Sequence, residues 1–297
     1  MFQYSQNSPG FAYNGDSMWY TESSANWYAS TRQMDSNTFS TGGAIVGNPQ
    51  LALWHGFLNE AEVDPASYEG RPGWMYGVRQ YAMHTYLYFM TEVCGLKKSL
   101  LTSGFYERTK LLPQEYFYVK GGSKMTRTCF ANWAAQNTAK MAYLTRAQYK
   151  RGIREITLAG TYDPEFYVPY AWEMADTDLS KDQLATPEER YRPRGWGYNV
   201  IRVNNTMPAT YSFDFKGAKT GSEGAASFFG TRIVVQSSDK DPVYKNLAMA
   251  TDGLSGQGSI TVDANDYEVA LVVAAVPEIF TGNQNYDYTV KINRQVV

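Results

Sequence analysis

Glu22 is the residue whose type and position most directly suggest chemistry in this sequence. It lies in the segment MWYTESSANWYAS, which begins at Met18 and reads as a helix. At helical spacing Met18, Glu22, Ala25 and Ala29 form one stripe, because residues three or four positions apart lie on the same helix face. Alanine lets a neighbouring helix come close. A glutamate in such a stripe is therefore either solvated at its edge or bound to a partner.

The sequence around Glu22 resembles the second metal-binding helix of the gluzincin zinc metallopeptidases. The resemblance rests on the aromatic-flanked E-x-x-A of WYTESSANW, on the preceding FQYSQNSPGFAYNGDS, and on the later order of a long aromatic helix and a β-rich C-terminal part. In that family an H-E-x-x-H helix supplies two histidine ligands and the catalytic base, and a glutamate on a following helix supplies the third ligand. The resemblance implies that Glu22 is the third zinc ligand of a secreted bacterial enzyme with a peptide or protein substrate.

The H-E-x-x-H motif itself does not occur in the chain, whose two histidines are His55 and His84. The sequence begins about where the second histidine of such a motif would end. We expect the motif either to lie upstream of residue 1 or to have been lost. This chain alone is then expected to be inactive and to hold no zinc, because two ligands and the base are missing.

His84 is a candidate for the donor that stabilises the carbonyl oxyanion, a role that a downstream His or Tyr plays in gluzincins. Its predicted helix also carries Tyr81 and Tyr88 on the same face, so the plainer interpretation is a half-buried core histidine. His55 is interpreted as a surface or helix-end residue.

Other catalytic classes have little support in the sequence. It contains no glycine-rich phosphate loop, G-x-S-x-G turn or C-x-x-C pair. A pair of carboxylates for glycoside hydrolysis stays open, because such residues need not be near each other in sequence. Its candidate members are Asp16, Glu22, Glu60 and Glu62.

Composition limits the choice of partners. The formal net charge of −2 favours neither nucleic acid nor an anionic membrane surface, and no apolar run approaches the ~20 residues of a membrane span. The high aromatic share, with 24 tyrosines, is typical of secreted and cell-surface proteins that bind sugars or peptides. Cys94 and Cys129 could pair, but both fall in predicted helices, and we favour free, buried thiols.

The hydrophobic period changes near the middle of the chain. Helical spacing predicts helices at 16–32, 50–59, 72–93 and from Ser123 onward, with a further turn at 146–154 and Gly95 ending the third helix. From about residue 195 the period is two. The run Val269 to Val276 is apolar throughout, as expected for a strand covered on both faces. The other predicted strands are YNVIRVN, TYSFDFKG, TRIVVQSS, GSITVDA and YDYTVKIN.

We therefore predict an α+β chain with a helical, incomplete metallopeptidase-like domain at 1–155, a linker or packed loops at 156–194, and an antiparallel β-sandwich at 195–297. The first interpretation of its function is a fragment of a secreted zinc-dependent peptidase. The alternative is a non-catalytic cell-surface protein that binds a glycan or a protein through its aromatic-rich helical domain and its sandwich.

Overall fold

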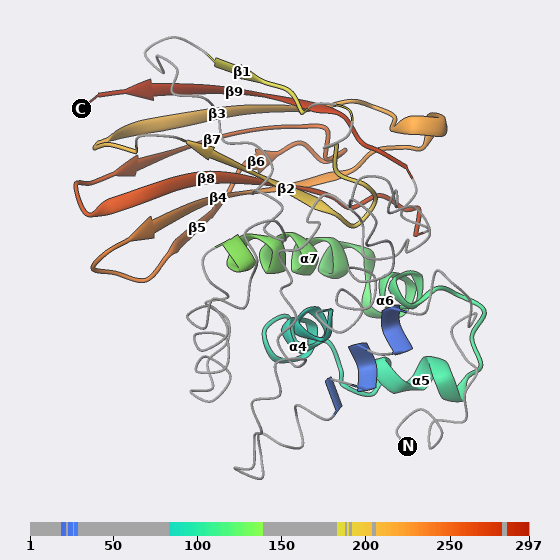
Figure 1. Ribbon diagram of the computed structural model, residues 1–297. Coiled ribbons are helices and arrows are strands. Elements are labelled where there is room, and N and C mark those ends of the chain that lie inside the picture. Colours follow the sequence, from blue (N-terminus) through green and yellow to red (C-terminus); the bar gives the residue numbers. More distant parts are fainter. Residues whose placement is uncertain are drawn as a thin grey trace, which may run out of the picture. The chain divides into compact units, whose positions relative to one another are not determined.

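The computed structural model describes residues 19–21, 23–25, 27–28, 83–138, 183–187, 189, 192–203, 206–280 and 284–296. These residues form helices followed by two antiparallel sheets, an α+β arrangement (Figure 1). The chain divides into a helical unit (1–51, 57–129 and 143–168) and a sandwich unit (52–56, 130–142 and 169–297). The sandwich unit thus includes residues 130–142.

The helical unit contains α4 (His84–Glu92), α5 (Leu100–Tyr106), α6 (Pro113–Gly121) and the first part of α7 (Ser123–Thr138). The described residues between 19 and 28 are helical, and α7 begins at the predicted Ser123. Gly95 has the left-handed φ of +76° that suits the residue after a helix end, which confirms it as the stop of α4. No helix among the described residues is long and apolar enough to cross a membrane.

Aromatic contacts fill the interior of the helical unit. The ring of Tyr20 stacks on Phe105 and meets Phe117 edge-on, and its hydroxyl donates a hydrogen bond to the carbonyl oxygen of Leu101. Such ring pairs stabilise a fold by about 0.5–1.5 kcal/mol beyond the area they bury. The N-terminal helical residues are therefore fixed to α5 and α6 by side-chain packing.

Cys94 and Cys129 form a disulfide, with their Cα atoms 5.9 Å apart. The expectation of free thiols was wrong because it placed both residues inside helices. Cys94 lies in the turn after α4, where the chain reverses at Gly95 and brings the sulfur to α7. The bond connects the turn after α4 to α7, within the same unit, across 35 positions of sequence.

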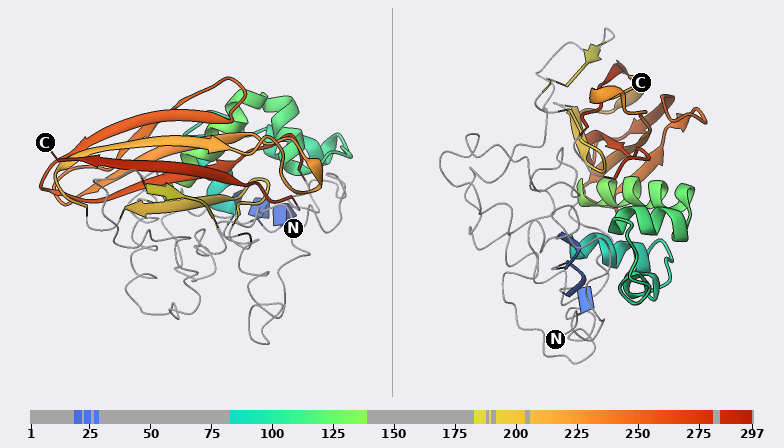
Figure 2. Two further views of the ribbon diagram at one scale, coloured as in Figure 1. Left: turned by 90° about the horizontal axis from the view of Figure 1, so that it is seen from above. Right: turned by 90° about the vertical axis from the view of Figure 1, so that its right-hand side faces the viewer.

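The sandwich unit is built from two antiparallel sheets (Figures 1 and 2). The five-stranded sheet has the order β1 (Gln183–Ala185), β9 (Tyr288–Gln295), β3 (Ala209–Gly217), β7 (Ser255–Val262) and β6 (Ala248–Met249). The four-stranded sheet has the order β2 (Tyr198–Val203), β8 (Asp266–Ala275), β4 (Phe229–Ser237) and β5 (Val243–Asn246). A short 3₁₀ helix, η5 (Ser222–Gly224), follows β3.

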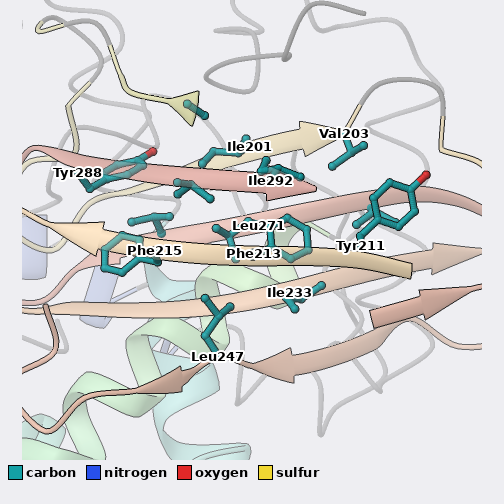
Figure 3. Packing of buried hydrophobic residues seen from close by; sticks show 14 of the residues in the cluster. Ile201, Val203, Tyr211, Phe213, Phe215, Ile233, Leu247, Leu271, Tyr288 and Ile292 are labelled. Atoms are coloured by element: carbon teal, nitrogen blue, oxygen red, sulfur yellow. The ribbon is translucent and has the colours of Figure 1, made fainter. Parts of the chain in front are cut away.

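One apolar core lies between the two sheets (Figure 3). Strand β3 alternates buried and partly exposed residues, so that Tyr211, Phe213 and Phe215 point inward. They meet Ile233 and Leu271, which the facing sheet contributes to the same core cluster. The period of two that predicted these strands is the period of this core.

The second face of the four-stranded sheet is covered by the second part of α7, which belongs to the sandwich unit. Phe130 and Trp133 of α7 pack against the ring of Tyr198. A Cβ atom at Gly230 would lie 2.8 Å from the Cβ of Ala131, so the helix approaches β4 at a position where only glycine fits. Residues 269–276 are completely buried as a result, which confirms the prediction of a strand covered on both faces.

All six strands expected from the sequence are present, and three short ones, β1, β5 and β6, were not expected. Helices α5 and α6 were also not expected. The predicted helices at 50–59 and 146–154, and the first part of the one at 72–93, lie outside the described residues.

Candidate functional site

Glu22, the predicted zinc ligand, lies outside the described residues, as do His55, Asp16, Glu60 and Glu62. The role of Glu22 therefore stays a prediction. Among the residues that the structure describes, no three His, Cys, Asp or Glu side chains gather as a group that could hold a metal ion.

His84, the predicted oxyanion donor, is the first residue of α4 and is only 1% exposed. Tyr88, which was expected on the same face, is buried as well, and Tyr81 lies outside the described residues. His84 is therefore an interior residue, more buried than the core interpretation expected. Its role as an oxyanion donor stays a prediction.

The outer face of the five-stranded sheet presents a continuous set of polar groups on strands β3, β7 and β9. Because side chains alternate along a strand, the residues between the inward-pointing ones of β3, β7 and β9 point outward. Each of these outward residues is partly or fully exposed. We call this set the polar face: Thr210, Ser212, Asp214, Lys216, Ser255, Gln257, Ser259, Thr261, Thr289, Lys291, Asn293 and Gln295.

Strand register arranges the polar face in four rows, each with one residue from β9, β3 and β7. In the first row the hydroxyls of Thr210 and Thr261 are 2.8 Å apart and share a hydrogen bond. Neighbouring strands lie about 4.8 Å apart and successive outward residues about 6.8 Å apart. The rows are Gln295–Thr210–Thr261, Asn293–Ser212–Ser259, Lys291–Asp214–Gln257 and Thr289–Lys216–Ser255.

The chemistry of the polar face is that of hydrogen bonding. Hydroxyl and carboxamide groups both donate and accept hydrogen bonds, and nine of the twelve residues carry one of these groups. The charged members are Asp214, Lys216 and Lys291. None of the twelve is aromatic, histidine or cysteine, so the face lacks both a stacking platform and a nucleophile with its base.

The polar face was visible in the sequence but was not recognised as a candidate site. In TYSFDFKG, hydroxyl and charged residues alternate with the aromatic residues Tyr211, Phe213 and Phe215. This alternation predicts one buried face and one solvated face for a strand. It does not predict which strands lie beside it, and only the register of β7 and β9 joins the outward residues of three strands into one surface.

No protein-family model matches the sequence, and no curated protein matches it. The PliG inhibitor of g-type lysozyme from Aeromonas hydrophila, a periplasmic protein, is similar in structure over 41% of this chain and 94% of its own, with 8% identity and a TM-score of 0.27. The xylan-binding CBM22-1 domain of Paenibacillus barcinonensis Xyn10C is similar over 39% of this chain and 83% of its own, with 12% identity and a TM-score of 0.23. TM-scores this low carry no argument about function.

Proposed function

We propose that this chain is a non-catalytic binding protein that acts outside the cytoplasm and holds a glycan on its polar face. The observation that carries the proposal is the polar face itself. The other sheet has the outer face of its central strands β8 and β4 buried, whereas this sheet presents rows of hydroxyl and amide groups to solvent. A ligand rich in hydroxyl groups can both donate to and accept from such a surface.

A glycan suits this surface better than a protein does. The centres of protein–protein interfaces are enriched in aromatic residues, Met and Arg and are depleted of Ser and Lys. The polar face has none of the enriched types and contains three serines and two lysines. Sugar hydroxyls, by contrast, are satisfied by direct bonds to such side chains or through bridging water.

The disulfide supports a location outside the cytoplasm. Structural disulfides form and persist in secreted and periplasmic proteins and are rare where thiols are kept reduced. The bond between Cys94 and Cys129 lies in a packed helical unit, and Cys129 is 1% exposed, which fits a structural role.

The residue types of the polar face support a role in binding and do not supply the groups that catalysis needs. Glycoside hydrolysis needs two carboxyl groups at the scissile bond, and the polar face carries only Asp214. The peptidase interpretation depends on Glu22 and on an H-E-x-x-H helix that the sequence lacks, and it stays a prediction. We expect no stoichiometric zinc in the dialysed chain, and elemental analysis that found it would contradict this expectation and show a metal site.

The proposal is tested by calorimetric titration of the full chain with a panel of soluble neutral polysaccharides. We expect at least one to bind. Gln257→Ala should weaken it by about 2- to 10-fold, since one net hydrogen bond contributes about 0.5–1.5 kcal/mol. The triple variant Ser212→Ala, Gln257→Ala, Asn293→Ala should bind too weakly to measure.

The matched control is Lys219→Ala with Thr220→Ala, two exposed residues in the loop beyond β3. This variant should bind as the parent does. The proposal is overturned if no polysaccharide binds, or if the triple variant and the control bind equally well. Binding of a protein that depends on Gln257 would overturn the assignment of a glycan.

A further inference from the structure

Strand β7 is paired along its whole length on one side and along only two residues on the other. On the first side β3 pairs with it from Ser255 to Val262. On the second side β6 pairs only with Gly256 and Gln257. Among the described residues no strand lies beside residues 258–262 on that side, and we call this stretch the open edge. A strand edge of this kind presents backbone N–H and C=O groups with which another chain can pair.

A hydrogen bond near the start of β7 shows which backbone groups point to the open side. The carbonyl oxygen of Ser255 accepts a 2.8 Å bond from the N–H of Ala250, which follows β6. In an antiparallel strand the backbone groups of successive residues point alternately to the two neighbouring strands. Ser259 and Thr261 lie an even number of positions beyond Ser255, so their N–H and C=O groups point away from β3 and toward the open side.

Lys245 of strand β5 closes part of the open edge. Its Nζ donates a 2.7 Å hydrogen bond to the carbonyl oxygen of Ser259. Strand β5 is the edge strand of the other sheet, and there Lys245 lies opposite Ile233, a residue of the apolar core. The lysine therefore takes an inward position on an edge strand and reaches across to β7. Inward-pointing charged residues are one of the means by which proteins prevent edge strands from pairing.

The rest of the open edge is suited to pairing with a copy of itself. The N–H of Ser259 and both backbone groups of Thr261 have no partner strand among the described residues. Two antiparallel copies centred on Ile260 would place Ser259 opposite the second copy's Thr261, so that each N–H meets a C=O. Ile260 packs against the core but is only partly buried, and a second copy would cover it.

We propose that Lys245 blocks the open edge of β7 against pairing with the same edge of a second copy. Its ammonium group occupies the Ser259 carbonyl, which a pairing strand would need. A pair of copies would also bring two lysines to one short edge, and like charges at close range disfavour pairing. The inference is independent of the proposed function, because it concerns the edge of the sheet and not the binding of a ligand to its outer face.

The test is sedimentation of the full chain and of Lys245→Ala over a range of concentrations. We expect Lys245→Ala to associate, with a mass that rises toward twice that of the parent, which should not associate by this route. Lys245→Arg keeps the charge and a donor and should behave as the parent does. Lys219→Ala is the matched control, because it removes another exposed lysine and changes the net charge equally.

Hydrogen exchange followed by NMR locates the association. In the parent the amides of Gly258 and Ile260, which point to β3, should exchange slowly, and those of Ser259 and Thr261 should exchange fast. At high concentrations of Lys245→Ala the amides of Ser259 and Thr261 should become protected, because they then bond to the second copy.

Adding Thr261→Pro to Lys245→Ala should restore the mass of the parent. Proline removes an N–H that points to the open side, so the variant blocks pairing without loss of a bond to β3. Equal masses of Lys245→Ala and the parent at every concentration would overturn the proposal. Association that survives Thr261→Pro, or that leaves the Ser259 amide unprotected, uses another surface and would overturn it as well.

Discussion

The described residues of the helical unit and of the sandwich unit both bury apolar side chains, but only the helical unit adds a disulfide between its elements. In the sandwich, inward residues of strands that are far apart in sequence, such as Phe213 and Ile292, form one continuous apolar core. In the helical unit the described interactions include the rings around Tyr20, buried apolar side chains such as Leu87 and Phe89, and one disulfide.

This difference teaches where each unit is sensitive to change. A core made by alternation depends on every strand keeping its face, because a polar residue on the wrong side lies in an apolar layer. A unit of short helices depends on tertiary packing and cross-links, since isolated helices of seven to nine residues, such as α4, α5 and α6, are marginal in water. Changes to the two units should therefore have separable effects.

The largest effect should come from a charge placed in the sandwich core. Leu271 is completely buried in β8, and Leu271→Asp should destabilise the sandwich by about 4 kcal/mol or more, from lost burial and an unsatisfied polar group. Denaturant unfolding measures the loss. Ser259→Asp, on an exposed outward position of β7, is the control and should stay within about 0.5 kcal/mol of the parent.

Hydrogen exchange followed by mass spectrometry shows where the loss occurs. Peptides from β3, β8 and β9 should lose protection in Leu271→Asp, whereas peptides from α5 and α6 should change little. An equal loss in both units would mean that the two unfold as one, and the comparison would fail.

The strands were predictable because their signal is local. The three inward aromatic residues of β3 and the apolar run of β8 are visible without any knowledge of the neighbours. Strands β5 and β6 were missed because they have four and two residues at the edges of their sheets, where exposure removes the alternation. Helix α5, LLTSGFY, is too short to show a helical period.

The candidate sites depend on information that the sequence does not carry. The four rows of the polar face could not be predicted from the sequence, because they depend on the register of three strands. The hydrogen bond from Arg232 of β4 to Asn132 of α7 joins two residues one hundred positions apart, and no local pattern predicts it. The disulfide was missed for a related reason, because it depended on whether Cys94 lies inside α4 or in the turn that follows.

A smaller effect, confined to the other unit, should follow from loss of the disulfide. Closing a loop of 35 positions removes chain entropy from the unfolded state, and this stabilises the folded unit by about 3–4 kcal/mol. The double variant Cys94→Ser, Cys129→Ser should therefore lower the protection of α5 and α6 against hydrogen exchange and leave β3 and β8 unchanged. Chemical reduction of the parent should reproduce this result. A parent-like exchange pattern after complete reduction would show that ring packing alone holds the helical unit.

The smallest effect concerns Tyr286, a sandwich residue that is completely buried and whose hydroxyl has no partner among the described residues. Burial raises the pKa of Tyr286, so above pH 10 the unfolded chain loses this proton while the folded protein keeps it. The unfolded state then binds fewer protons, and the free energy of unfolding falls as the pH rises, by at most about 1.4 kcal/mol per pH unit for one such group.

Tyr286→Phe removes this contribution and breaks no hydrogen bond to the described residues. It should be neutral or stabilising by about 1 kcal/mol at pH 7, and its advantage over the parent should grow between pH 10 and 11 in denaturant unfolding. A constant difference across that range would show that the hydroxyl reaches water in the folded state, and the sandwich core would be less closed at this end than its packing implies.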